Sequence, residues 1–200
     1  EGISSDKIKL VGDVMYDATL YYQTKAYQPA ALKLQSDNTP FVLCTIHRAE
    51  NTDDTTRLKA IIRTLNQIAE RMPVILPLHP RTAVALSHLD SAKLAPVVQV
   101  IKPVSFLEMT WLLNHCALVI TDSGGLQKEA YFHQRPCLIL RNETEWVELV
   151  KAGYNQLITP FETDTVNILN KMLELNIPKS DGLFGSGDAA EKIIDSIRSE

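Results

Sequence analysis

The sequence predicts an α/β fold with a doubly wound, Rossmann-like parallel sheet, and three observations support this prediction. Short runs rich in Val, Ile and Leu recur along the chain, helical patterns separate them, and prolines fall at the junctions. Such runs are typical of strands buried on both faces, and their alternation with helices implies right-handed crossovers between parallel strands. The 200 residues, 45% of them hydrophobic, are enough for one sizeable core, so a single domain over residues 1–200 is expected.

Each expected strand is a short apolar run, and each expected helix carries apolar residues at helical spacing. The strands are expected at Ile8–Val11, Phe41–Ile46, Val74–Leu78, Val97–Ile101, Leu118–Thr121 and Pro136–Leu140. The helices are expected at Val14–Gln28, Thr55–Arg71, Thr82–Leu89, Ser105–Asn114, Leu126–His133, Glu143–Ala152, Thr163–Leu175 and Asp188–Ile197. The glycine-rich segment Pro178–Gly187 is predicted to be a linker, or alternatively a ligand loop.

Composition argues against several functional classes. The net charge is -4 and no run of Lys or Arg stands out, so neither a nucleic acid nor an acidic membrane surface is an expected partner. No stretch approaches the roughly 18 apolar residues of a membrane span, and no signal peptide opens the chain, so a cytoplasmic location is expected. The cysteines Cys44, Cys116 and Cys137 lack paired spacing, so neither a metal site nor a cofactor is predicted, and buried thiols are expected.

The segment around Ser123-Gly124-Gly125 is predicted to bind an anion. A buried strand ends at Thr121 and a glycine pair leads directly into a helix, whose first N–H groups and positive dipole end suit phosphate. Glu129 lies further along that helix, where its carboxylate could accept hydrogen bonds from a ribose diol. Glycine also permits such tight turns for structural reasons alone, so this motif by itself leaves both readings open.

Other polar groups follow neighbouring strands, at the edge where ligands bind in parallel sheets. His47, Arg48 and Glu50 follow one strand, and His79 and Arg81 follow the next. Taken singly, each histidine could be a surface or cap residue, and each arginine could pair with a carboxylate on a solvated rim. Their joint occurrence at one edge instead indicates a common site.

Several motifs follow one another along the chain in a fixed order. They are Val11-Gly12-Asp13, His47-Arg48-Ala49-Glu50-Asn51, His79-Pro80-Arg81, Thr121-Asp122-Ser123-Gly124-Gly125 with Glu129, and Thr144-Glu145. With these motifs the chain resembles the non-hydrolysing UDP-N-acetylglucosamine 2-epimerases. The resemblance covers most of the chain and matches the C-terminal half of that family, whose two Rossmann-like domains form a GT-B type fold.

The resemblance implies roles for these positions. His47 would lie near the diphosphate and the reacting sugar as the catalytic residue, with Arg48 and Glu50 binding substrate. Ser123, Gly124 and Gly125 would hold phosphate, and Glu129 would bind the ribose. His79 and Arg81 would contribute a regulatory or diphosphate contact.

The resemblance also implies a reaction and a missing partner. UDP would be eliminated to leave a 2-acetamidoglucal and then added again on the other face, and the acid and base carboxylates would come from an N-terminal domain that this chain lacks. The start at Glu1-Gly2-Ile3 is therefore expected to be a junction between domains, the isolated chain is expected to be inactive, and a homodimer is possible.

Three departures from the family pattern leave the sugar open. Trp146 replaces an arginine, Lys128 replaces a glutamate, and Met109 replaces a phenylalanine. The tryptophan variant is similar to relatives that act on modified sugars such as 2,3-diacetamido uronic acids. The donor domain of a GT-B glycosyltransferase and a non-catalytic nucleotide-binding module are the alternative functions.

Overall fold

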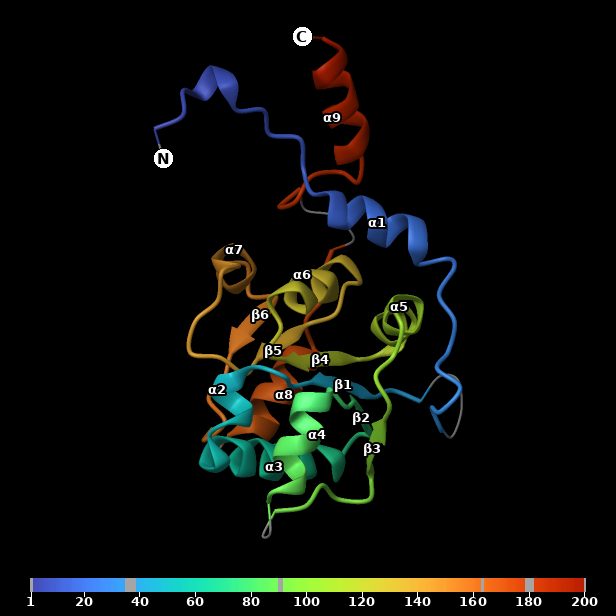
Figure 1. Ribbon diagram of the computed structural model, residues 1–200, viewed down its shortest axis with the longest axis vertical. Coiled ribbons are helices and arrows are strands. Elements are labelled where there is room, and N and C mark those ends of the chain that lie inside the picture. Colours follow the sequence, from blue (N-terminus) through green and yellow to red (C-terminus); the bar gives the residue numbers. More distant parts are fainter. Residues whose placement is uncertain (1, 35–38, 90–91, 163, 179–181, 200) are drawn as a thin grey trace.

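The strands form one parallel six-stranded sheet with helices on both faces (Figure 1). The computed structural model describes residues 2–34, 39–89, 92–162, 164–178 and 182–199. The strands are β1 (Val42–Thr45), β2 (Val74–Pro77), β3 (Val98–Ile101), β4 (Leu118–Thr121), β5 (Cys137–Ile139) and β6 (Asn155–Leu157). Their order in the sheet, β3-β2-β1-β4-β5-β6, is that of a Rossmann-type doubly wound fold and confirms the predicted fold class.

Helices fill the connections between the strands. They are α1 (Val14–Tyr22), α2 (Ala49–Thr52), α3 (Thr55–Ala69), α4 (Pro80–Ser87), α5 (Phe106–His115), α6 (Gly124–Phe132), α7 (Val147–Lys151), α8 (Thr165–Leu173) and α9 (Ala189–Arg198), with a short 3-10 turn at Ser5–Lys7. In Figure 1, α9 and the N-terminal segment lie beyond α1, at the end of the molecule away from the sheet.

The sheet is buried on both faces because alternate residues of each strand point to opposite sides. On one face, Val42 and Cys44 of β1 pack with Ile61 of α3 and Leu169 of α8. On the other face, a second hydrophobic cluster packs the strand residues that point to that side against helices α5 and α6. That cluster includes Leu43, Val119, Leu112, Leu113, Leu126 and Ala130. The three cysteines are buried and unpaired as thiols, and burial raises the pKa of Cys116 to about 12.

One predicted strand is wrong and one observed strand was missed. Ile8–Val11 is not a strand: Leu10 is 97% exposed, so this apolar run has no sheet beside it. The sixth strand is instead β6, which is too short and too polar to show an apolar run. It is recognisable only through its pairing with β5, where Cys137 faces Asn155.

Several helix boundaries also differ from the prediction. The helix expected to reach Gln28 ends at Tyr22, and the Asn114 side chain donates a hydrogen bond of 3.2 Å to the carbonyl of the C-cap residue Gln23. The helix expected from Glu143 begins at Val147, after a loop in which the backbone N–H of Trp146 donates to Thr144 Oγ1. The short helix α2 was not predicted, and Thr163 lies outside the described residues.

Residues 182–187 of the predicted linker pack against the chain just before α1. The Asp13 N–H donates to the carbonyl of Phe184 over 3.0 Å, and Gly185 approaches so near to Gly12 that a Cβ would lie 2.9 Å from the Gly12 Cα. Both glycines have positive φ, +100° and +90°, which explains why glycine is required at this contact. No helix in the described residues is long and apolar enough to cross a membrane.

Candidate functional site

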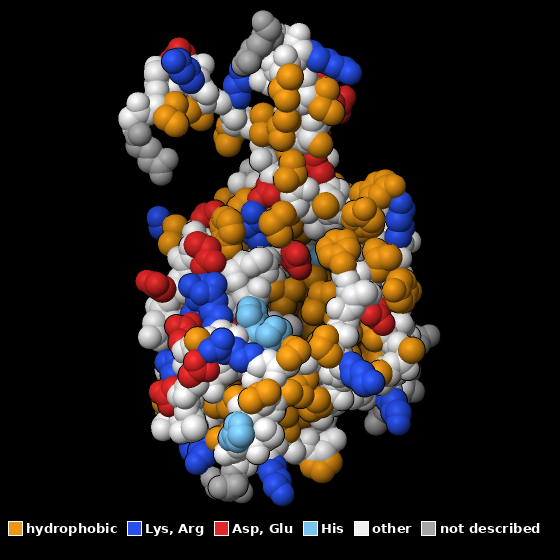
Figure 2. Space-filling model, viewed as in Figure 1, with side chains coloured by type: hydrophobic (Ala, Val, Ile, Leu, Met, Phe, Trp, Pro, Cys, Tyr) orange, Lys and Arg blue, Asp and Glu red, His pale blue; other side chains and the backbone are white. Residues whose placement is uncertain are grey.

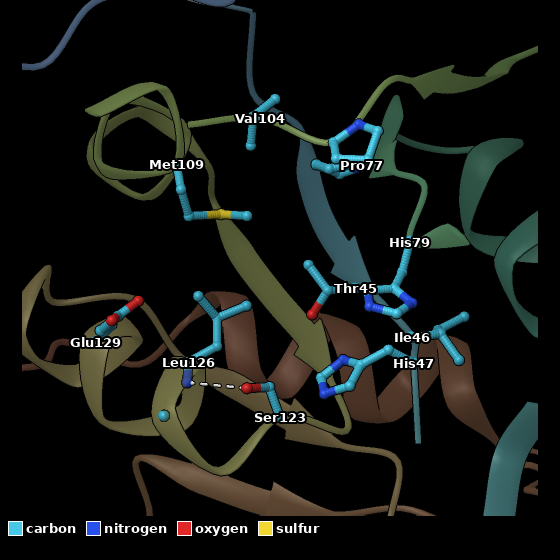
Figure 3. Close-up of a pocket in the computed structure, with 12 residues that line it drawn as sticks. Thr45, Ile46, His47, Pro77, His79, Val104, Met109, Ser123, Leu126 and Glu129 are labelled. Carbon is cyan, nitrogen blue, oxygen red and sulfur yellow. Dashed lines mark hydrogen bonds between the residues drawn. The ribbon is translucent and has the colours of Figure 1, made fainter. Parts of the chain in front are cut away.

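A pocket of about 320 Å³ opens at the carboxyl edge of the sheet. It is lined by the ends of β1 and β2, by residues that follow β1, β2, β3 and β4, and by helices α5 and α6. The crossovers leave in opposite directions from β1 and β4, which makes this the switch point where doubly wound sheets bind ligands. The lining residues are Thr45, Ile46, His47, Pro77, His79, Pro103, Val104, Met109, Ser123, Gly125, Leu126 and Glu129. Figure 3 shows His47 and His79 on one side of the pocket, and Glu129 and Met109 on the opposite side.

The predicted strand-turn-helix motif is present at the floor of this pocket. β4 ends at Thr121, Ser123 is the N-cap, and α6 begins at Gly124. The Ser123 hydroxyl accepts a hydrogen bond from the Leu126 N–H over 3.5 Å, drawn as a dashed line in Figure 3. Ser123 and Gly125 line the pocket, so the positive end of the α6 dipole faces it.

The two glycines of this turn have different surroundings, which gives a matched pair of substitutions. A Cβ at Gly124 would collide with Glu145 Oε1, whereas a Cβ at Gly125 would meet no atom within 4 Å. Gly124→Ala is therefore expected to lower the free energy of unfolding by up to about 1 kcal/mol, because the flexible Glu145 side chain must move and its ion pairs with Arg48 and Arg141 are disturbed. Gly125→Ala is expected to leave it unchanged or raise it by about 0.4–1 kcal/mol. Urea denaturation of both variants checks this, and equal destabilisation would contradict it.

His47 follows β1 and stands against a buried carboxylate that the sequence did not single out as a site residue. Asp122 is fully buried, and it accepts hydrogen bonds from the backbone N–H groups of His47 and Arg48 and from the Asn51 side chain. The Nδ1 atom of His47 lies 3.3 Å from Asp122 Oδ1. Strand pairing of β1 with β4 brings these residues together across 75 positions of sequence.

His79 lies in the pocket but Arg81 does not. The rings of His47 and His79 are 5.5 Å apart, and His79 caps α4 by accepting the Arg81 N–H on Nδ1 over 3.1 Å. The Arg81 guanidinium turns instead to Asp53, with Nη2 2.6 Å from Oδ2, and to Thr52. The side-chain hydrogen bond from Arg81 is the main cause of the lowered pKa of Asp53.

The other two predicted substrate-binding residues, Arg48 and Glu50, lie beside the pocket in a group of ion pairs. Arg141 Nη1 lies 2.6 Å from Glu145 Oε2, and Arg141 Nε lies 3.8 Å from Glu50 Oε1. Arg48 Nη2 lies 3.9 Å from Glu145 Oε1. The backbone N–H of Glu145, and then Arg141 and Arg48, lower the pKa of the Glu145 carboxyl. Figure 2 shows basic and acidic side chains gathered on one side of the histidines and hydrophobic side chains on the other.

Glu129 lies on α6 at the wall of the pocket, where it is partly buried, and burial raises its pKa. Next to it along the helix, the buried Lys128 pairs with Asp13 and lies 4.2 Å from the centre of the Trp146 ring. Trp146 in turn donates its indole N–H to the Gly124 carbonyl over 2.8 Å. Trp146 therefore contacts the back of the glycine turn and is absent from the pocket lining.

The sheet order, the pocket at the switch point and the helix N-terminus in that pocket define a Rossmann-like α/β domain with a candidate ligand site at its switch point. A family model for UDP-N-acetylglucosamine 2-epimerase matches residues 1–198. The chain therefore belongs to the UDP-N-acetylglucosamine 2-epimerase family, as the sequence motifs predicted.

Individual relatives agree with this assignment. A UDP-2,3-diacetamido-2,3-dideoxy-D-glucuronate 2-epimerase from Pseudomonas aeruginosa is 45% identical over 96% of this chain and 52% of its own length. A Methanocaldococcus jannaschii UDP-GlcNAc 2-epimerase, crystallised with UDP-GlcNAc and UDP, superposes with a TM-score of 0.81 at 31% identity, over all of this chain and 57% of its own. The chain thus spans about half the length of these relatives.

The calicheamicin glycosyltransferase CalG4 shares the fold alone. Its TM-score is 0.51 at 15% identity, over 87% of this chain and 42% of its own. Fold is therefore common to epimerases and glycosyltransferases, and the two functions must be separated by their sites. In the described part of the chain, no cluster of three or more His, Cys, Asp or Glu side chains is arranged to hold a metal ion.

Proposed function

We propose that this chain is the UDP-binding half of a UDP-sugar 2-epimerase, which interconverts UDP-GlcNAc and UDP-ManNAc, or a modified UDP-N-acetyl sugar, for bacterial surface polysaccharides. One observation carries the proposal: His47 and, from a distant part of the sequence, Ser123, Gly125 and Glu129 line a single pocket. Family membership and the ligands of the Methanocaldococcus enzyme support it.

The parts of UDP match the parts of the pocket. The diphosphate is placed at Ser123 and Gly125, where the first turn of α6 offers N–H groups and a positive dipole end. The ribose hydroxyls donate to Glu129 further along the same helix. The flat base then lies against the apolar side chains of Val104 and Met109, since ligand pockets hold such groups in mainly apolar surroundings.

In the proposed reaction, a base removes the proton at C2, the bond between C1 and the diphosphate oxygen breaks, and UDP leaves. UDP then adds to the resulting 2-acetamidoglucal, and a proton is delivered to the opposite face of C2. Negative charge grows on the departing diphosphate, where donors fixed in advance, including His47 and the α6 N-terminus, stabilise the transition state. The carboxylates that exchange the C2 proton are assigned to the N-terminal domain, so this chain alone is expected to be inactive.

The identity of the sugar is proposed from the tryptophan position. In sequence comparison the diacetamido-glucuronate epimerase is 45% identical to this chain, above the 34% of the Methanocaldococcus jannaschii UDP-GlcNAc 2-epimerase. Trp146 stands at the position where many family members carry an arginine, so this chain offers the sugar no cation there. The Trp146 side chain instead packs behind the glycine turn. A modified UDP-N-acetyl sugar is therefore the favoured substrate, and UDP-GlcNAc is the comparison.

Binding tests the site. UDP is titrated calorimetrically into the chain and into Gly125→Ala, whose Cβ meets no protein atom but would stand where phosphate is placed. Loss of about tenfold or more in affinity is expected, equivalent to about 1.4 kcal/mol. Unchanged affinity in a variant of unchanged stability would refute the assignment of phosphate to this turn.

Deuterium incorporation tests the reaction and separates the alternatives. The protein with its N-terminal half is incubated in deuterated water with UDP-GlcNAc or the diacetamido uronate. Deuterium at C2 supports epimerisation. Its absence together with sugar transfer to an acceptor would identify a glycosyltransferase, and binding of UDP without either reaction would identify a non-catalytic module.

A further inference from the structure

We propose that Asp122 is a positioning residue for His47: it keeps the proton of the neutral imidazole on Nδ1 and leaves Nε2 as the nitrogen that meets the ligand. The proposal deepens the proposed function, because it specifies how the histidine of that site acts. It concerns the free protein, so it can be tested without substrate.

The first argument is the position of the carboxylate. Asp122 Oδ1 lies 3.3 Å from His47 Nδ1, and Asp122 is fully buried, so the contact is hardly weakened by water. A carboxylate facing Nδ1 favours a proton there and disfavours a lone pair. The His47 side chain is nevertheless 38% exposed, and it lines the pocket. The exposed edge is the one away from Asp122, and Nε2 belongs to it.

The second argument is that Asp122 itself is held in place. Its Oδ2 accepts the Arg48 N–H and the Asn51 side-chain amide, both at 3.0 Å. Asn51 uses its own oxygen to accept two hydrogen bonds from the Arg57 guanidinium, at 3.1 and 3.2 Å. This network orients the carboxylate, as outer partners orient catalytic or metal-binding histidines elsewhere. It also gives the last residue of the His-Arg-x-Glu-Asn motif a physical role.

The third argument is the contrast with the neighbouring histidine. His79 accepts the Arg81 N–H on Nδ1, so its proton must be on Nε2. The two rings, 5.5 Å apart, thus present the same nitrogen, Nε2, to one pocket in different states: a donor on His79 and an acceptor on neutral His47. Protonation of His47 then occurs at Nε2, which makes that nitrogen a charged donor to a diphosphate.

The experiment is a long-range ¹H–¹⁵N spectrum of the chain with ¹⁵N-labelled histidine, recorded at rising pH until the ring signals stop changing. Two histidines provide references in the same sample. His79 is expected with its proton on Nε2, and His115, whose Nδ1 lies 2.7 Å from the Trp111 carbonyl, with its proton on Nδ1. His47, assigned by the signal lost in His47→Gln, is expected to match His115. A match to His79 instead would overturn the proposal.

Asp122→Asn supplies the causal test. The Asn oxygen can keep the Oδ2 contacts, including the His47 backbone N–H at 3.1 Å. Its NH₂ group then takes the place of Oδ1, 3.3 Å from His47 Nδ1, where it favours a lone pair on that nitrogen. The His47 proton is then expected to move to Nε2, with the signals of His79 and His115 unchanged. Asp17→Asn is the matched control, because Asp17 also accepts two backbone N–H groups, at the start of α9. A folded Asp122→Asn protein that keeps the Nδ1 proton would contradict the proposal, whereas failure of UDP to bind would contradict only the proposed function.

Discussion

Replacing Asp13 with alanine is expected to lower the free energy of unfolding by about 3–5 kcal/mol, because it leaves a buried ammonium group without its counterion. Asp13 is the N-cap of α1, where it accepts the Met15 N–H over 2.8 Å, and it pairs with Lys128. The Lys128 side chain is only 7% exposed. The Trp146 and Phe184 rings, 4.2 and 5.3 Å from its ammonium group, do not replace a carboxylate. Urea denaturation of the chain measures the effect.

A double-mutant cycle with Lys128→Met separates the ion pair from the helix cap. Methionine keeps much of the lysine volume without its charge. In Lys128→Met, the Asp13 carboxylate loses its counterion but is still 17% exposed and still caps α1, so it is less destabilised than an unpaired Lys128 would be. Lys128→Met alone should therefore cost less than Asp13→Ala. In the double variant only the cap, about 1 kcal/mol, should remain lost. Additive losses would show that the two residues are not coupled.

The sequence predicted the parts of the fold that rest on local pattern. β1 to β5 are apolar runs that alternate with helical patterns along the chain, and this alternation predicts a parallel sheet. The prediction of strands failed where the burial of a segment depends on residues distant in the sequence. Ile8–Val11 is apolar, yet Leu10 is exposed because no strand lies beside it, whereas β6 is polar and pairs with β5 at the sheet edge.

The same distinction applies to the site. His47, His79, Ser123, Gly125 and Glu129 follow strand ends or a recognisable turn, so their convergence on one edge could be predicted, and the structure brings them into one pocket. Other side chains turn elsewhere, and their directions are set by partners that spacing does not reveal. Arg81 turns to Asp53, Arg48 to Glu145 and Glu50 to Arg141.

Asp122 was missed because its contacts are tertiary. In the sequence it is one more residue before a glycine turn, and only the pairing of β1 with β4 places it beneath His47. The departures Lys128 and Trp146 were noticed separately. The structure shows them in contact, with Lys128 over the Trp146 ring, so they are better understood as one change than as two.

Replacing Glu129 with glutamine is expected to have opposite effects on binding and on stability. The charged carboxylate is placed to accept hydrogen bonds from the ribose, and hydrogen bonds to charged groups contribute about 1.5–3 kcal/mol each. UDP affinity measured by calorimetry at neutral pH should therefore fall by about 10- to 100-fold. The free chain should become more stable, because burial penalises the charged form of Glu129, as its raised pKa indicates.

The pH dependence follows from the direction of that shift. A carboxyl whose pKa is higher in the folded than in the unfolded chain destabilises the fold only when it is ionised, so the penalty is absent below the ordinary value of 4.5 and complete above the folded value. The stability advantage of Glu129→Gln should therefore vanish as the pH falls through this window. The ratio of the two UDP dissociation constants should start to fall as the pH drops through the folded value, and should approach one only below the lower pKa that the carboxyl has when it binds the ribose. The titration of UDP itself is common to both proteins and does not affect this ratio. Glu143→Gln, at an exposed loop position, is the control expected to change neither quantity. A stability advantage that persisted at low pH would show that burial of the charge is not its cause.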